Sequence, residues 1–305
     1  MTHANIQHRL IIRLEDVLAT KIVQVDAPPQ GMSSHVFFIT TDVGIEYAVK
    51  YGQAAFKEIA PLQLIARGDA TIPIPALIAW FELEEIQVVV MSKIKFPLLE
   101  SVSVAQMGSY VPSMIRSLRG IHANVSNRPG SLGYARSSWK EVLYAIFSGE
   151  NFDWNEISKR PGLDTHLVLS SVAQILELIQ AKEFDEGAYS LLHTDYNQRN
   201  LFVNPLTNEI IGIIDWEEAM YGDPIYDMAR VRMYLWHFNL GNQVIDDYYQ
   251  LVQFTPHQKR LEALYWLTRV IQYLAWYSAE RTEFNLARIS LHQEFLRTYD
   301  WNLVT

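Results

Sequence analysis

The sequence predicts an α+β fold in two lobes, with strands in the first lobe and helices in most of the second. The chain has 305 residues, which is long for one hydrophobic core and suits two lobes or domains. Short apolar runs typical of strands lie before residue 92, whereas apolar side chains after residue 95 recur three and four positions apart, as they do on helices. We therefore expect a small lobe at residues 1–94 and a mainly helical lobe at residues 95–305.

The composition excludes several classes of protein. An apolar fraction of 49% and a charged fraction of 19% indicate a globular chain. The 25 basic and 34 acidic residues give a net charge of −9, which argues against nucleic acid as a main partner and permits a cationic small substrate. There are no cysteines, and therefore no disulfide or thiolate metal site. The sequence has neither a signal-type N-terminus nor a run of the roughly 20 apolar residues that span a membrane, so we expect a cytoplasmic protein without a membrane partner.

The small lobe is expected to begin with a packing helix at residues 5–18 and to continue in strands. The five strands are expected at residues 21–25, 36–40, 44–51, 79–81 and 87–91. Ser33 and Ser34 lie in a turn of small residues between the first two strands, where backbone N–H groups can approach anionic oxygens closely. The alternative is an ordinary hairpin turn, because Gly31 is the only glycine of this turn.

Lys50 lies at the end of the third strand, whose other residues are mostly apolar. A lysine at such a position is disfavoured unless it has an anionic partner, and the alternative is a lysine that faces solvent on an edge strand. Glu58 is the candidate partner. Because proline is tolerated only in the first turn of a helix or at a kink, Pro61 leaves open whether Glu58 lies in the next helix or before it.

The stretch from Leu191 to Asp227 carries the polar residues that are the main candidates for catalysis. Two apolar runs at 201–203 and 210–214 flank an Asn-Pro-Leu-Thr-Asn turn and predict a hairpin. Asp195 and Asn200 come before the first strand and Asp215 follows the second. Folding the hairpin is therefore expected to bring these three oxygen-bearing side chains to the same end of it.

This spacing fits a phosphoryl-transfer site. Such a site holds a polyphosphate, neutralises its charge with magnesium and orients an acceptor hydroxyl. Mg²⁺ prefers oxygen ligands, so Asn200 and Asp215 are the candidate metal ligands. Asp195 then remains to accept the hydroxyl proton or to orient it.

The loop from His193 to Asn200 resembles the catalytic loop of the protein-kinase-like superfamily. The chain differs from protein kinases where Thr194, Asn197 and Trp216-Glu217 stand. The segments at 214–217 and 222–227 instead resemble the aminoglycoside phosphotransferase branch of that superfamily. Within the branch, the tracts at 137–147 and 214–224 are most similar to hygromycin-type phosphotransferases.

The resemblance implies a two-lobed kinase-like α+β fold with about five antiparallel strands in the small lobe. It implies that Lys50 binds the α- and β-phosphates of ATP or GTP, that a glutamate holds this lysine, and that the turn at Ser33 and Ser34 covers the nucleotide. Met91 and Ile94 would border the hinge that grips the adenine, although such residues are also common in a plain core. Mg²⁺ is the implied cofactor.

The resemblance also implies roles for residues around Asp195. His193 is expected to hold the loop by hydrogen bonds, without taking part in the chemistry. Asp223 and Asp227 are expected to tie down the catalytic loop or to cap the next helix.

The expected function is transfer of the γ-phosphoryl group of ATP or GTP to a hydroxyl of an aminoglycoside-like or aminocyclitol-like acceptor, as in antibiotic resistance. The alternatives are a kinase of another small metabolite, such as choline, homoserine or a macrolide, and a nucleotide-binding pseudokinase. The sequence leaves open the acceptor, the choice between ATP and GTP, and the oligomeric state. It also leaves open which aromatic side chains after residue 228 line the acceptor site.

Overall fold

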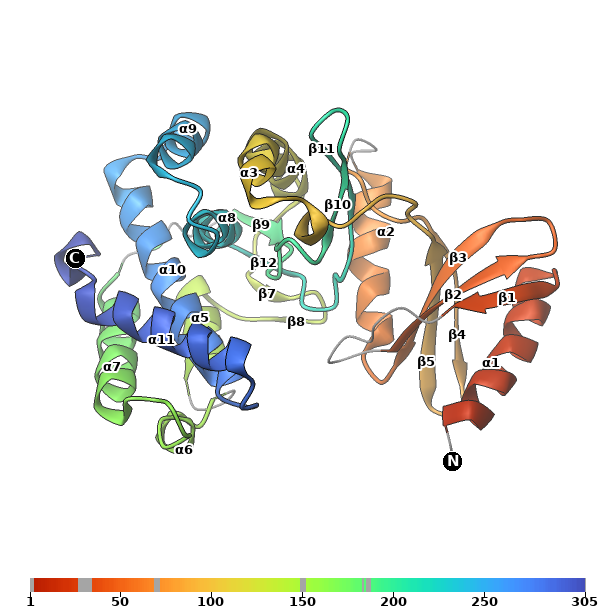
Figure 1. The fold of residues 1–305 in the computed structure, drawn as a ribbon, viewed down its shortest axis with the longest axis horizontal. Coiled ribbons are helices and arrows are strands. Elements are labelled where there is room, and N and C mark those ends of the chain that lie inside the picture. Colours follow the sequence, from red (N-terminus) through yellow and green to blue (C-terminus); the bar gives the residue numbers. More distant parts are fainter. Residues whose placement is uncertain are drawn as a thin grey trace. The chain divides into compact units, whose positions relative to one another are not determined.

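The computed structural model describes residues 3–26, 35–68, 72–148, 152–182, 184 and 188–304. The chain divides into two compact units, and each is built from two separate segments (Figure 1). The first unit comprises Met1–Ile121 and Asn197–Ala219, and the second comprises His122–Tyr196 and Met220–Thr305. The lobe boundary at residue 94 stays a prediction.

The first unit contains the five-stranded antiparallel sheet that the sequence predicts (Figure 1). Its strands are β1 (Ile22–Asp26), β2 (His35–Thr41), β3 (Glu46–Gly52), β4 (Leu77–Leu83) and β5 (Ile86–Ser92). They lie in the order β1-β2-β3-β5-β4, and every neighbouring pair is antiparallel. Because β3 lies between β2 and β5, Lys50 is on a central strand and not on an edge.

Helix α1 (His3–Leu18) packs on this sheet, as its apolar periodicity predicts (Figure 1). Leu10 and Leu14 are fully buried and join a core cluster with sheet residues that include Phe37 and Val49. A fully buried leucine side chain contributes about 1.5–3 kcal/mol of hydrophobic stabilisation.

The hairpin of β10 (Leu201–Asn204) and β11 (Glu209–Ile213) also belongs to the first unit. The Ile213 N–H donates to the carbonyl of Pro73 at 2.7 Å, and the Val203 N–H donates to the carbonyl of Pro97 at 2.9 Å. Glu209 binds Ser113 and Arg116 of helix α4 (Val111–His122). These bonds tie the hairpin to segments 93 to 140 residues earlier in the chain. The other helices of this unit are α2 (Ile59–Arg67), α3 (Val104–Met107) and α4 (Val111–His122), with short 3₁₀ helices at Ala55–Glu58, Leu99–Ser101 and Gly108–Tyr110.

The second unit is mainly helical and holds a large aromatic core. Its longer helices are α5 (Trp139–Phe147), α7 (Thr165–Ala181), α8 (Ile225–His237), α9 (Asn242–Val252), α10 (Pro256–Tyr277) and α11 (Glu283–Thr298), with short helices α6 (Trp154–Ile157) and Trp301–Leu303. Most aromatic residues after residue 228 serve this core, as their helical spacing predicts. No helix among the described residues is long and apolar enough to cross a membrane.

A small sheet of short strands accompanies the helices of the second unit. Its order is β6-β9-β12-β7-β8. The strands are β6 (Val125–Ser126), β7 (Gly130–Ser131), β8 (Tyr134–Ala135), β9 (Tyr189–Leu192) and β12 (Met220–Gly222). β9 leads into the loop that carries Asp195, and β12 leads into the Gly222-Asp223-Pro224 segment and α8.

Candidate active site

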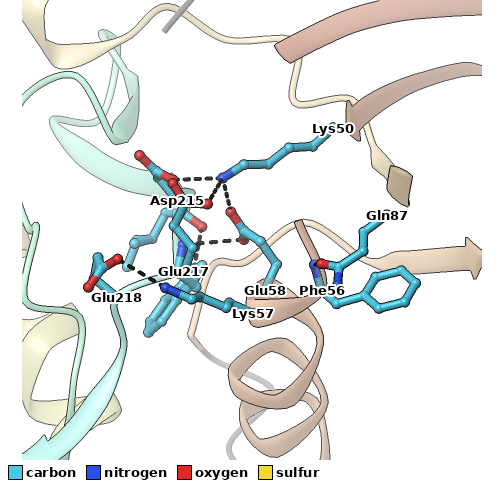
Figure 2. Close-up of polar contacts among 10 residues, drawn as sticks. Lys50, Phe56, Lys57, Glu58, Gln87, Asp215, Glu217 and Glu218 are labelled. Atoms are coloured by element: carbon cyan, nitrogen blue, oxygen red, sulfur yellow. Dashed lines mark hydrogen bonds and ion pairs between the residues drawn. The ribbon is translucent and has the colours of Figure 1, made fainter. Parts of the chain in front are cut away.

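Lys50 is buried and lies at the centre of a group of charges in the first unit (Figure 2). Its Nζ lies 2.5 Å from the Oε1 of Glu58 and 2.8 Å from the Oδ1 of Asp215. The Oε2 of Glu217 lies 3.5 Å away. A buried lysine on a central strand thus has the anionic partners that the sequence led us to expect, and the solvent-facing alternative does not apply.

Glu58 is held in place by a 3₁₀ helix that is fixed to the sheet and by a hydrogen bond from a backbone N–H group. It is the last residue of the 3₁₀ helix before α2, so it lies before the α-helix, and Pro61 falls in the first turn of α2, where proline is tolerated. The N–H of Phe56 donates to Oε1 of Gln87 in β5 at 3.0 Å, which fixes the 3₁₀ helix to the sheet (Figure 2). The Oε2 of Glu58 accepts the N–H of Trp216 at 3.2 Å.

The electrostatics of this group favour a charged lysine. Burial alone lowers the pKa of Lys50, but the negative charges of Glu58 and Asp215 more than offset it, so the pKa of Lys50 is raised. Burial raises the pKa of Glu58, and the ammonium of Lys50 opposes that rise. We regard the ammonium as the fixed charge of the cluster, because two carboxylates accept hydrogen bonds from it.

Asn200 and Asp215 lie at the same end of the hairpin, as predicted. Leu201 pairs with Ile213, and the Ile214 N–H donates to the carbonyl of Asn200 at 3.0 Å. Asp215 has a positive φ of 68°, which aspartate tolerates better than most residues because its short polar side chain can bond locally. A carboxylate and an amide oxygen are donors that suit Mg²⁺, which commonly takes one or two protein ligands and fills its shell with phosphate oxygens and water.

Asp195 follows β9 in the second unit, in a loop that hydrogen bonds hold from within. The Asp195 N–H donates to Nδ1 of buried His193 at 3.2 Å. Asp227 accepts the N–H groups of His193 at 2.8 Å and Thr194 at 2.9 Å, and its Oδ2 lies 3.2 Å from Nε2 of His122. These are the structural roles expected of His193 and Asp227. Asp195 and the hairpin belong to different units. The prediction that Asp195 lies at the same end of the hairpin as Asn200 and Asp215 therefore stays a prediction.

Asp227 is fully buried, yet its carboxylate is favoured in the ionised form. Burial raises the pKa of Asp227, whereas the bonds and charges of His122 and His193 lower it, and the net result is a lowered pKa. Nearby, Asp223 accepts the N–H of Ile225 at 2.9 Å, just before α8, and also the hydroxyl of Tyr265 at 2.7 Å.

The sequence interpretation missed two buried arginines beside Asp195. Arg230 of α8 and Arg269 of α10 are 4% and 7% exposed, respectively. Arg230 forms an ion pair with Asp195, and both arginines donate to the carbonyl of Thr194. The available clue was an arginine among apolar residues of a helix, since a buried guanidinium needs an anionic or carbonyl partner.

The functional roles of all candidate site residues stay predictions. Ser33 and Ser34 lie outside the described residues. Met91 is 7% exposed in β5, where it pairs with Ala48. Ile94 follows β5 and packs against Gly212 of the hairpin so closely that a Cβ on this glycine would lie 2.5 Å from Ile94 Cδ1.

Comparison with known proteins identifies the family. A family model described as "Phosphotransferase enzyme family" matches residues 25–264. The chain belongs to this family. Hygromycin-B 4-O-kinase of Escherichia coli is 30% identical over 97 residues, which are 31% of this chain and 26% of the relative. The match therefore spans about a quarter of that relative.

Two solved structures share the fold of this chain. A thermostable mutant of aminoglycoside phosphotransferase APH(4)-Ia, in a ternary complex with AMP-PNP and hygromycin B, gives a TM-score of 0.70 at 15% identity, over 96% of this chain and 97% of that chain. Spectinomycin phosphotransferase APH(9)-Ia, in complex with ADP and spectinomycin, gives a TM-score of 0.63 at 18% identity, over 97% of this chain and 96% of that chain. The chain thus has the kinase-like α+β fold that the sequence predicted, with a five-stranded antiparallel sheet and a helical lobe.

Proposed function

We propose that this phosphotransferase family member transfers the γ-phosphoryl group of ATP or GTP to a hydroxyl of a small-molecule acceptor. The observation that carries the proposal is the contact of Lys50 with both Glu58 and Asp215, next to the hairpin end that also holds Asn200. This arrangement puts an ammonium for phosphate oxygens beside oxygen donors for a metal ion.

The residues divide the work as follows. Lys50 binds the α- and β-phosphates, and Glu58 keeps its ammonium in place. Asn200 and Asp215 would hold Mg²⁺, which neutralises phosphate charge when it is bound. Asp195 accepts the proton of the acceptor hydroxyl, whose oxygen forms the new bond to the γ-phosphorus while the bond between that phosphorus and the bridging oxygen breaks and releases the nucleoside diphosphate.

The acceptor class that we propose is an aminoglycoside or an aminocyclitol. The similarity to a hygromycin kinase and to a spectinomycin phosphotransferase supports this class, and the net charge of −9 is compatible with a cationic acceptor. Function lies in the acceptor site more than in the fold, so choline, homoserine and macrolides belong in any test.

A coupled assay of nucleoside diphosphate release tests the proposal. Magnesium-ATP and magnesium-GTP are each combined with hygromycin B, several aminoglycosides, spectinomycin, a macrolide, choline and homoserine. We expect one acceptor to stimulate release and to gain the mass of one phosphoryl group. The Asp195→Asn variant should bind nucleotide but lose turnover. Nucleotide binding without turnover across the whole panel would favour the pseudokinase instead.

A further inference from the structure

The guanidinium of Arg230 binds two consecutive residues of the loop that carries Asp195, the backbone carbonyl of Thr194 and the side chain of Asp195. Arg230 pairs through Nη2 with Oδ1 of Asp195, and its Nε donates to the carbonyl of Thr194 at 3.1 Å. Its Nη1 donates to the hydroxyl of Tyr273 in α10 at 3.2 Å. Because the donors of arginine are fixed in one plane, these three bonds fix the orientation of Asp195 relative to α8 and α10.

Thr194 needs such support. Its φ is +65°, a left-handed conformation that is strained in a β-branched residue. Its N–H donates to Asp227 at 2.9 Å, and its carbonyl accepts from Arg230 and, at 3.0 Å, from Arg269. The contacts with α8 and α10 therefore hold Thr194 in this conformation. The conformation of Thr194 in turn sets the direction in which the side chain of Asp195 points.

The two side chains of the Arg230–Asp195 ion pair differ in burial. The side chain of Arg230 is 3% exposed, whereas that of Asp195 is 37% exposed. Arg230 therefore binds the carboxylate from the interior, and more than a third of the Asp195 side chain stays accessible. Burial lowers the pKa of Arg230, but Tyr273 and Asp195 more than offset this effect and raise it, so the guanidinium remains charged.

We propose that Arg230 is a positioning residue, which holds Thr194 and Asp195 so that the carboxylate meets the acceptor hydroxyl in one fixed orientation. The inference rests on the proposed function, because it assumes that Asp195 orients or deprotonates that hydroxyl. Positioning contributes to the chemical step, where a displacement of about 1 Å can cost about 100-fold in rate.

The test compares Arg230→Gln with Arg232→Gln. Arg232 lies in the same helix, two positions further on, and its Cζ lies 4.5 Å from the centroid of the Trp266 ring. We expect Arg230→Gln to lower kcat by about 100-fold with an unchanged Kd for magnesium-ATP. We expect Arg232→Gln to lower Tm but to keep the wild-type kcat below the unfolding transition.

Rescue experiments separate positioning from general stability. Arg230→Lys should restore part of kcat, because one ammonium can reach Asp195 or the Thr194 carbonyl but cannot copy the planar arrangement of donors. Millimolar guanidinium chloride should raise kcat of Arg230→Ala, whereas sodium chloride at the same ionic strength should not. Equal losses of kcat in the Gln variants of Arg230 and Arg232, without rescue, would overturn the proposal.

Hydrogen exchange of the peptide at residues 191–199 gives a measurement that needs no acceptor. Arg230→Gln should exchange faster there than wild type and Arg232→Gln, since a restraint on the loop is lost. Wild-type exchange in Arg230→Gln would overturn the inference. If the wild-type protein phosphorylates no acceptor, the proposed function fails, while the exchange experiment still decides whether Arg230 holds the loop.

Discussion

The Nζ of Lys50 lies 2.8 Å from the Oδ1 of Asp215, although the two residues are 165 positions apart in the sequence. This contact links the third strand of the sheet to the end of the β10–β11 hairpin within one compact unit. Glu58 completes the arrangement from the segment between β3 and α2. Lys50 is therefore fixed by carboxylates at the place where, in the proposed function, phosphate oxygens would bind.

Replacing Lys50 by methionine should destabilise the protein and abolish turnover. The change leaves Glu58 buried without its cation, and breaking a buried ion pair on one side costs about 3–5 kcal/mol. Lys57→Met is the matched control, because the pair of Lys57 with Glu218 is exposed and spans 3.5 Å (Figure 2). That pair should contribute no more than about 1 kcal/mol. Urea unfolding measures both, and similar losses would contradict the importance of the buried pair.

Asn200→Ala should raise the magnesium concentration that gives half-maximal turnover. The variant removes one of the two proposed oxygen ligands and leaves Asp215 in place. Asn204→Ala is the control, since Asn204 accepts the N–H of Leu206 in the hairpin turn at 3.0 Å. Initial rates are measured against free Mg²⁺, and chelation of the metal should stop turnover in the wild type. An unchanged magnesium requirement in Asn200→Ala would remove this residue from the metal site.

Asp227→Asn should loosen the loop that carries Asp195. The carboxylate accepts two loop N–H groups and contacts His122, and an amide would place donors against donors. We expect a loss of about 3 kcal/mol in the free energy of unfolding. Asp164→Asn is the control, because Asp164 caps α7 from a side chain that is 42% exposed. If both variants unfold at the same urea concentration, the buried anchor contributes little.

Stability should fall as the pH drops below about 6.5. His292 of α11 is fully buried against aromatic rings of α8 and α10, and burial, with a further contribution from the charge of Arg288, lowers the pKa of His292 to about 4. His237, whose ring centroid lies 5.3 Å away, has its pKa lowered to about 3, mainly by burial. The unfolded chain, with ordinary histidine pKa values near 6.5, then binds protons that the folded chain does not.

The sign of this effect follows from linkage. The stabilisation is fully present above about pH 6.5 and declines toward pH 4, by at most about 1.4 kcal/mol per pH unit for each histidine. Urea unfolding at pH 7, 6 and 5 measures the slope. His292→Gln should flatten it, whereas His166→Gln, at an exposed position of α7, should not. A slope that His292→Gln leaves unchanged would show that other groups cause the acid sensitivity.

Much of the first unit could be predicted from the sequence because its features are local. Strand periodicity gave the five strands, and the Asn-Pro-Leu-Thr-Asn turn gave the hairpin of β10 and β11. That hairpin then determined that Asn200 and Asp215 come together, since the register of a short antiparallel pair follows from its turn. A lysine at the end of an apolar strand further required an anionic partner.

The tertiary structure decided which partners meet. The sequence could not place Glu58 relative to α2, and it did not indicate that Glu217 approaches Lys50. It could not show that Arg230 and Arg269 meet the Asp195 loop, because helical periodicity fixes spacing and not the neighbour that a helix face meets. Their contacts with the Asp195 loop join residues 35 and 75 positions apart, and such long-range pairs exist only once the helices have packed.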